Sequence, residues 1–228
     1  MKFLTAITLV TFFLMGCGSP NLDDPVTLDK ILAEAMDWDS LQKRGEEGEE
    51  LYYAPNQESP FTGWAKKMYE NGQTQVLSWC EDGVFNGHII RWYENGQKSM
   101  EKKGKEGANI STGWYKNGQK KFTRKWKGED LKMFEETWKP NGEKCHKTVL
   151  NEGNGVVLQY HENGQVIRED NYKDGKLHGL RTSWDENGKK ILELNFKNGK
   201  PHGYTYYHSD GEPWIKSEYK DGEKVGHK

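Results

Sequence analysis

A short turn motif recurs along the chain at an almost constant interval. Six Asn-Gly pairs and one Asp-Gly pair place their glycines 24, 22, 24, 22, 24 and 23 residues apart. These glycines are Gly72, Gly96, Gly118, Gly142, Gly164, Gly188 and Gly211. Asn-Gly between strand-forming segments predicts a two-residue β-hairpin turn in which both residues take positive φ. The sequence therefore predicts seven hairpins in seven copies of one repeat, numbered here in chain order.

A second set of turns connects one hairpin to the next. These turns are Asp82-Gly83, Asp174-Gly175, Asn198-Gly199 and Asp221-Gly222. Each copy is then a strand, a tight turn, a strand and a second turn, and successive copies form an antiparallel β-meander in which each contacts its neighbours. Copies 3 and 4 lack the clean second turn, at residues 103–107 and 127–130, so we expect irregular twist or a bulge there.

Large side chains occupy a fixed position in each copy, four residues before the turn glycine. They are Met68, Trp92, Trp114, Trp138, Tyr160, Trp184 and Tyr207. Apolar or aromatic residues also recur four and eight residues after the glycine, as at Phe122 and Trp126. Side chains alternate between the two faces of a strand, so these even offsets predict that all three columns share one face of the sheet. Polar and charged residues dominate the opposite face, as in an antiparallel sheet with one solvated side.

The composition agrees with a thin sheet and excludes two classes of protein. Only 33% of the 228 residues are hydrophobic and the mean hydropathy is −1.01, yet 12% are aromatic and 26 are glycine. A disordered chain would be poor in aromatic residues. The formal net charge is −2, with 33 Lys and Arg against 35 Asp and Glu, so we expect no nucleic-acid partner.

Several copies share motifs with a known repeat family. The motifs are WYENGQK (92–98), YHENGQ (160–165), NYKDGKLHG (171–179), SWDENGKK (183–190) and NFKNGKPHG (195–203). With these segments the chain resembles the MORN-repeat proteins, and more closely their bacterial variant, which often carries an antitoxin-like label. The resemblance covers about residues 41–226. It implies an all-β fold, an elongated, curved, single-layer antiparallel meander, with no catalysis by the repeats themselves.

The first 17 residues have the layout of an export signal. Lys2 precedes an apolar run at residues 3–14, which is too short to cross a membrane as a helix. The run ends in LMGC (14–17), which resembles the lipobox of bacterial lipoproteins. The resemblance implies removal of a signal peptide (1–16), lipid attachment at Cys17 and a location in the cell envelope, with Gly18 favouring the outer membrane where the source has two membranes. A conventional signal peptide with a chance cysteine, or an apolar N-terminal helix, is the alternative.

A tether and a helix lie between this signal and the repeats. Residues 17–24 are polar and turn-forming, as expected of a tether. Asp24-Pro25 then predicts a helix start, and apolar residues at helical spacing predict one amphipathic helix over residues 25–45. We expect this helix to cap the repeat domain of residues 46–228, because repeat arrays need polar caps. The alternative is a helix lying on a membrane, although anionic headgroups would repel its acidic face.

No pattern in the sequence predicts a catalytic or metal site. His178 and His202 occupy equivalent positions in adjacent copies, about 9–10 Å apart at the usual strand spacing, so they do not converge on one ion. No hydrolase, zinc-protease or phosphate-loop motif is present. We therefore expect no enzyme activity, no metal and no cofactor. Cys80 and Cys145 lie about six strands apart and are predicted to be free thiols.

Aromatic side chains are the candidates for binding contacts. Trp92 and Trp114 can form a stacking surface for a ligand. The alternative is that most of these rings cover one another as a core. This alternative is favoured because each copy must bury apolar surface to be stable. Side chains one residue closer to the turn point to the opposite face and are candidates for exposed contacts. They are Tyr69, Tyr93, Tyr115, His161 and His208.

Together these features favour a non-catalytic binding protein. The first hypothesis is a membrane-anchored lipoprotein whose repeat sheet binds a protein partner or acts as a scaffold. Immunity or antitoxin roles rest only on the family label, and an export signal fits poorly with neutralising a cytoplasmic toxin. The alternative is recognition of an envelope glycan or a lipid headgroup by exposed aromatic residues and charged turns.

Overall fold

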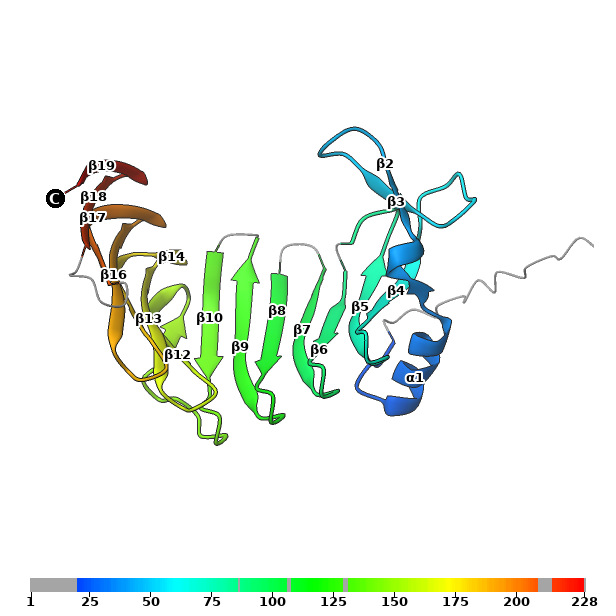
Figure 1. Ribbon diagram of the computed structural model, residues 1–228, viewed down its shortest axis with the longest axis horizontal. Helices are drawn as coiled ribbons and strands as arrows, with labels where there is room; N and C mark the ends of the chain where they lie inside the picture. Colours follow the sequence, from blue (N-terminus) through cyan, green and yellow to red (C-terminus); the bar gives the residue numbers. More distant parts are fainter. Residues whose placement is uncertain (1–19, 86, 106–107, 129–130, 209–214, 228) are drawn as a thin grey trace, which may run out of the picture. The chain divides into compact units, whose positions relative to one another are not determined.

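The computed structural model describes residues 20–227 except 86, 106–107, 129–130 and 209–214 (Figure 1). The predicted signal peptide, the lipid-attachment residue Cys17 and the seventh turn at Asp210-Gly211 lie outside the described residues. The chain divides into two compact units, Met1–Glu34 and Ala35–Lys228. Over the part of the chain that the structure describes, no helix has the length and apolar character needed to cross a membrane.

The first unit contains helix α1 (Pro25–Glu34). Asp24 caps its start, because its Oδ2 accepts hydrogen bonds from the backbone N of Thr27 (2.9 Å) and from the Thr27 hydroxyl (2.5 Å). A side-chain oxygen that binds the third residue of a helix is the usual N-terminal cap. The predicted start of the helix is therefore confirmed.

The predicted end of this helix at residue 45 was wrong. After Glu34 the chain forms strand β1 (Met36–Asp37) and the 3₁₀ turn η1 (Trp38–Ser40), which belong to the second unit. The Trp38 ring stacks on Phe85 with ring centroids 3.9 Å apart, and Met36 pairs with Ala65. These tertiary contacts outweigh the helical spacing of the apolar residues. The role of the helix as a cap stays a prediction.

The second unit is built from strands. In chain order they are β1 (Met36–Asp37), β2 (Gln42–Arg44), β3 (Leu51–Tyr53), β4 (Gly63–Met68), β5 (Thr74–Cys80), β6 (Ile89–Trp92), β7 (Lys98–Lys105), β8 (Ala108–Trp114), β9 (Lys120–Lys127), β10 (Leu131–Thr137), β11 (Val149–Asn151), β12 (Asn154–Tyr160), β13 (Val166–Lys173), β14 (Lys176–Leu177), β15 (Gly179–Trp184), β16 (Lys190–Lys197), β17 (Lys200–Tyr207), β18 (Ile215–Lys220) and β19 (Glu223–His227).

Seventeen of these strands form one long open sheet (Figure 1). From β4 to β13 and from β15 to β19, strands that follow one another in the sequence pair antiparallel. Strand β13 pairs with both β14 and β15, and β1 pairs parallel with β4. Strands β2 and β3 form a separate two-stranded sheet. The predicted all-β meander is confirmed.

The Asn-Gly turns differ from the predicted type. In the first turn, the Gly72 N donates to the Tyr69 carbonyl (3.0 Å), and the Tyr69 N donates to the Gln73 carbonyl (2.8 Å). Gly72 has a φ of 80°, while Asn71 keeps a negative φ and its Oδ1 accepts a hydrogen bond from the Gln73 N (3.0 Å). This is a type I turn followed by a left-handed glycine in a bulge. Positive φ at both turn residues occurs instead in the second turns, as at Asp174-Gly175.

The bulge decides which residues share a face of the sheet. Trp92 pairs with Lys98, but the register then shifts and Arg91 pairs with Met100. Paired residues lie on one face and neighbours along a strand on opposite faces. The same shift occurs in the hairpins β4–β5, β8–β9, β12–β13 and β15–β16. The tryptophan column therefore lies opposite the columns that follow the glycine, and the prediction of one shared face was wrong.

We name the two faces by their side chains. The face of Trp92, Lys98, Trp114 and Lys120 is the Trp-Lys face. The opposite face, which carries Arg124, is the Arg face: Arg124 pairs with Ser111, three residues before Trp114 and so on the opposite side of β8.

The fourth copy interrupts the regular meander. Strand β11 pairs with β10 and β12 over residues 149–151 alone. Between β10 and β11, residues 139–148 form turns, with a single bridge between Trp138 and Lys144. The register of β10 also shifts between Lys132 and Phe134, which confirms the irregularity expected after residues 127–130. At residues 103–107 the expected bulge is absent from the described positions, because β7 and β8 pair without a register shift.

A small apolar core fills the interruption. Its buried members are Tyr115, Cys145, Leu158 and Tyr160. The Cys145 Sγ lies 2.8 Å from the Tyr160 hydroxyl, and the Thr148 Oγ1 accepts a hydrogen bond from the Leu158 N (3.0 Å). A buried backbone N–H needs an acceptor, so the Thr148 hydroxyl takes the place of the strand that is absent at this level.

Candidate binding site

Four side chains of the predicted Tyr and His set join one copy to the next. Each places a polar atom on a backbone carbonyl oxygen of the following hairpin. The pairs are Tyr69 to Trp92 (2.8 Å), Tyr93 to Trp114 (2.9 Å), Tyr115 to Trp138 (2.8 Å) and His161 to Trp184 (3.2 Å). We call these hydrogen bonds the inter-copy rungs. They satisfy carbonyls that the bulge would otherwise leave without partners.

The rungs change the expectation that these side chains make exposed contacts. Tyr115 has no exposed surface, so for this residue the expectation was wrong. Tyr69, Tyr93, His161 and His208 are half-buried, and binding by these four stays a prediction. Burial raises the pKa of the Tyr93 and Tyr115 hydroxyls, which keeps both protonated as hydrogen-bond donors.

Asparagine side chains in the turns add a second set of links. Each Nδ2 donates to a backbone carbonyl in the turn of the following copy. The pairs are Asn71 to Glu94 (3.1 Å), Asn95 to Lys116 (2.9 Å), Asn117 to Pro140 (2.8 Å) and Asn163 to Glu186 (2.7 Å). The Oδ1 of each asparagine also holds its own turn. The turn edge of the sheet is therefore engaged in stacking the copies.

The Trp-Lys face carries the other predicted binding residues. Trp92 and Trp114 are both half-buried. The Lys98 Nζ lies 5.4 Å from the centroid of the Trp114 ring, and the Lys120 Nζ lies 4.9 Å from that of Trp138. An ammonium group over an indole ring makes a favourable cation–π contact. Lysines of this face thus cover ring faces that would otherwise be open to a ligand.

A buried carboxylate, Glu101, also lies on the Trp-Lys face. It accepts from the His88 Nε2 (2.6 Å), the Lys103 Nζ (2.9 Å) and the Lys98 Nζ (3.1 Å). Burial acts to raise the pKa of this carboxyl, but the hydrogen bonds from His88, Lys103 and Lys98 outweigh it and hold the pKa at about 2. Glu101 is therefore a structural anion whose partners stabilise the charged form.

The Arg face buries two further ionic clusters. Glu135 contacts the Lys132 Nζ (2.7 Å) and the Arg124 Nη2 (3.6 Å). The second cluster joins Asp170 to the Nε of Arg181 (2.5 Å) and of Arg168 (3.2 Å). Burying a carboxylate is costly unless a cation is close, so each cluster is held together by its own charges.

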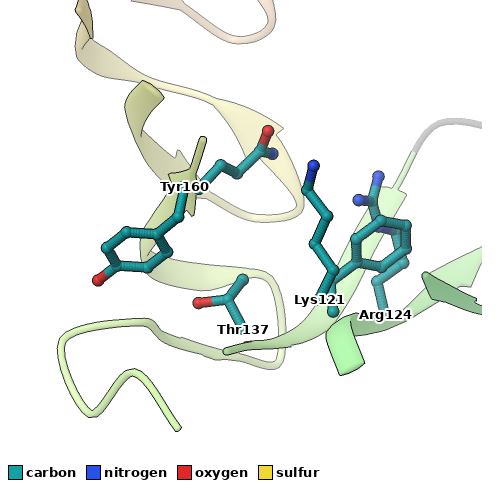
Figure 2. A pocket seen from close by; sticks show the side chains of 6 residues that line it. Lys121, Arg124, Thr137 and Tyr160 are labelled. Atoms are coloured by element: carbon teal, nitrogen blue, oxygen red, sulfur yellow. The ribbon is translucent and has the colours of Figure 1, made fainter. Parts of the chain in front are cut away.

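A pocket of about 200 Å³ opens beside the first cluster, at the interruption. It is lined by Lys121, Phe122, Arg124, Thr137, Gln159 and Tyr160, from strands β9, β10 and β12 (Figure 2). In Figure 2, Lys121 lies between Tyr160 and Arg124. The three-residue strand β11 pairs with the start of β12, well before Gln159, so a pocket remains where a full strand would lie.

Sequence reasoning did not single out Lys121, Arg124 or Gln159. The available signal was indirect: copy 4 has Met133 where regular copies have a glycine, and residues 127–130 lack a clean second turn. Such irregularity predicts a break in the array. It does not predict which side chains a break exposes, because that depends on the register shift in β10.

The described residues also bear on the predictions for metal sites and cysteines. No group of three or more His, Cys, Asp or Glu side chains in the described ranges is arranged to hold a metal ion. Cys80 and Cys145 are buried free thiols, as predicted. Burial raises the pKa of Cys80 to about 11. Burial also acts to raise the pKa of Cys145, but hydrogen bonds with Tyr160 and Thr148 outweigh it and lower the pKa.

Comparison with protein families supports the repeat assignment for part of the chain. A family model described as a MORN repeat variant matches residues 154–174 and 177–198. These residues span strands β12 to β16, the regular hairpins that follow the interruption. A search of curated proteins found no match to the chain. The fold and the matched segments together describe a MORN-like β-meander, a type of repeat that is typically non-catalytic.

Proposed function

We propose that the chain is a non-catalytic binding protein of a bacterial cell envelope, anchored by lipid on Cys17, whose repeat sheet binds a protein partner. The observation that carries the proposal is the row of half-buried tryptophans on the Trp-Lys face, each paired with a lysine. Trp residues and cationic side chains are prominent where protein partners meet. Repetition presents the same pair in register along the sheet.

Two contacts favour a protein over a glycan as the partner. Sugars stack on open aromatic faces, but Lys98 lies over Trp114 and Lys120 lies over Trp138. Acidic side chains of a protein can pair with these lysines while apolar groups contact the ring edges. The alternative, an envelope glycan or lipid headgroup, would need lysines that move away from the rings.

The partner proposal is tested by crosslinking capture from solubilised envelope with the full chain as bait. We expect one specific partner whose capture falls in Lys120→Glu, because the substitution reverses the charge on the Trp-Lys face. Arg91→Glu, at an exposed position on the Arg face, is the matched control and retains the partner. Equal capture by all three baits, or saturable binding to a purified envelope glycan in place of a protein, contradicts the proposal.

The anchor rests on the apolar run of residues 3–14 followed by LMGC (14–17). Growth with labelled palmitate tests it. We expect label on the wild-type chain and none on Cys17→Ser. Equal labelling of both chains contradicts lipid attachment at this residue.

A further inference from the structure

The pocket at the interruption gathers cationic groups with unused hydrogen-bond donors. The Lys121 ammonium lies 4.9 Å from the centroid of the Tyr115 ring. Within the described ranges it has no hydrogen-bond acceptor and no ion pair. The Nε of Arg124 is buried and likewise has no acceptor among the described residues. Donors left without acceptors in a half-buried site carry a cost that a bound anion would remove.

Among the described residues, Glu135 neutralises Arg124 only in part, and no carboxylate contacts Lys121. Glu135 lies 3.6 Å from Arg124 but only 2.7 Å from Lys132, so Lys132 is its main partner. Glu162 is exposed, and its charge acts to raise the pKa of Lys121 from a distance, without a contact. Burial lowers the pKa of Lys121, with Glu162 opposing the shift only in part. An anion in the pocket would stabilise the charged form of this side chain.

Other side chains of the pocket limit the kind of anion. The Phe122 ring lies 3.6 Å from the Arg124 guanidinium carbon and gives the pocket an apolar wall. The Gln159 Oε1 accepts a hydrogen bond from Arg168 (3.0 Å), which leaves the NH₂ group of Gln159 as a further donor. A planar anion with an apolar body fits a guanidinium, an amide and a ring better than a strongly hydrated phosphate does.

We propose that this pocket binds a carboxylate group, with Lys121 and Arg124 as its counterions, Gln159 as a neutral donor and Phe122 against its apolar body. The carboxylate belongs to a free organic acid or to a polypeptide. Most of the lining lies on the Arg face, including Phe122, Arg124 and Gln159, so the proposal is separate from the partner proposed for the Trp-Lys face.

Calorimetric titration of the full chain in detergent tests this site. Benzoate is the first probe and benzamide is its uncharged match. Acetyl-Ala-Ala-Phe with a free terminal carboxylate, and the same peptide as its amide, form the polypeptide arm. We expect both carboxylates to bind saturably and both amides not to bind. The tighter of the two carboxylates identifies the source.

Variants then locate the binding. Lys121→Gln is expected to weaken benzoate binding about tenfold, because one charge-assisted hydrogen bond is lost. Lys125→Gln removes the same charge from an exposed position on the same strand and is expected to leave binding unchanged. Arg124→Lys keeps the charge but loses the planar fork, so an intermediate loss is expected. Thermal unfolding checks that each variant is folded.

Four results would overturn the assignment. They are benzamide binding as tightly as benzoate, equal losses in Lys121→Gln and Lys125→Gln, inorganic phosphate binding more tightly than either carboxylate, and the lack of saturable carboxylate binding up to about 10 mM.

Discussion

The regular copies and the interrupted fourth copy connect to their neighbours by different means. In copies 1 to 3 a tyrosine hydroxyl and an asparagine amide bind carbonyls of the next copy. In copy 4 the equivalent of Tyr115 is Lys139, whose ammonium contacts Glu143 (3.1 Å) within its own turn. The link to the next copy is made instead by the core around Cys145 and Tyr160.

This difference separates two tasks of the sheet. Regular copies repeat hydrogen bonds that each stabilise the folded chain by about 1 kcal/mol, and together they hold the strands in register. The interrupted copy buries ions and apolar groups in place of a strand, which leaves room for a pocket. The regular copies therefore stack on one another, and the interrupted copy leaves a pocket.

The largest effect is expected at the buried ion pair beside the interruption. Lys132→Met leaves Glu135 buried with only Arg124 nearby, at 3.6 Å. Breaking a buried pair on one side costs about 3–5 kcal/mol of folding free energy. Urea unfolding followed by tryptophan fluorescence measures it. Lys127→Met, at an exposed position on β9, is the control, and equal stability of the two variants would show that the pair contributes nothing.

The carboxylate of the second regular copy gives a smaller, pH-dependent effect. The folded-state pKa of Glu101 is about 2, below its usual value near 4.5, so its stabilisation is full above pH about 4.5. It is lost as pH falls from about 4.5 to about 2, and amounts to on the order of 2–3 kcal/mol. Glu101→Gln should therefore lower stability at pH 7 and flatten its pH dependence below pH about 4.5. If Glu101→Gln lost as much stability as the wild type between pH about 4.5 and about 2, the burial and pairing of Glu101 would be contradicted.

A rung in a regular copy is expected to matter less than either charge. Tyr93→Phe removes the hydroxyl that donates to the Trp114 carbonyl at 2.9 Å. The loss leaves a carbonyl without this partner and should cost about 1 kcal/mol in urea unfolding. Binding of the proposed protein partner should not change, since the hydroxyl is engaged within the sheet. A stable variant that loses the partner would instead make Tyr93 a binding residue.

The smallest effect is expected for the corresponding change in the interrupted region. Tyr160→Phe removes a hydroxyl that faces the Cys145 Sγ at 2.8 Å. Sulfur is a weak hydrogen-bond partner, so the cost should stay below about 0.5 kcal/mol. A larger loss for Tyr160→Phe than for Tyr93→Phe would mean that the thiol contact, and not the apolar core, holds the interruption together.

The repeat period was enough to predict the all-β meander, because each turn motif encodes one hairpin and each hairpin can pair only with its neighbours. The same motif misled the prediction of the faces. Asn95 keeps a negative φ and the following bulge shifts the register, so Trp92 and Met100 lie on opposite sides of the sheet. Offsets counted through a turn cannot reveal this, since a one-residue bulge exchanges the faces.

Less of the candidate site could be predicted from the sequence. Tyr93 and Tyr115 were predicted as contacts because the alternation pointed them away from the tryptophans, but the carbonyls freed by the bulge bind their hydroxyls. Lys121 and Arg124 look like ordinary charged residues of a strand. They form a site only because β11 is short and β10 changes register, and both features follow from packing in three dimensions.

The regular copies stack on one another, whereas the interrupted copy is proposed to bind a ligand. Amide hydrogen exchange of the full chain, with and without benzoate, tests this difference most directly. Bound ligand should slow exchange in segments around residues 120–124, 135–138 and 157–160, because binding stabilises the elements that form the pocket. Exchange in the regular hairpins β4–β5 and β15–β16 should not change. Protection confined to those hairpins, or spread evenly along the sheet, would contradict the account.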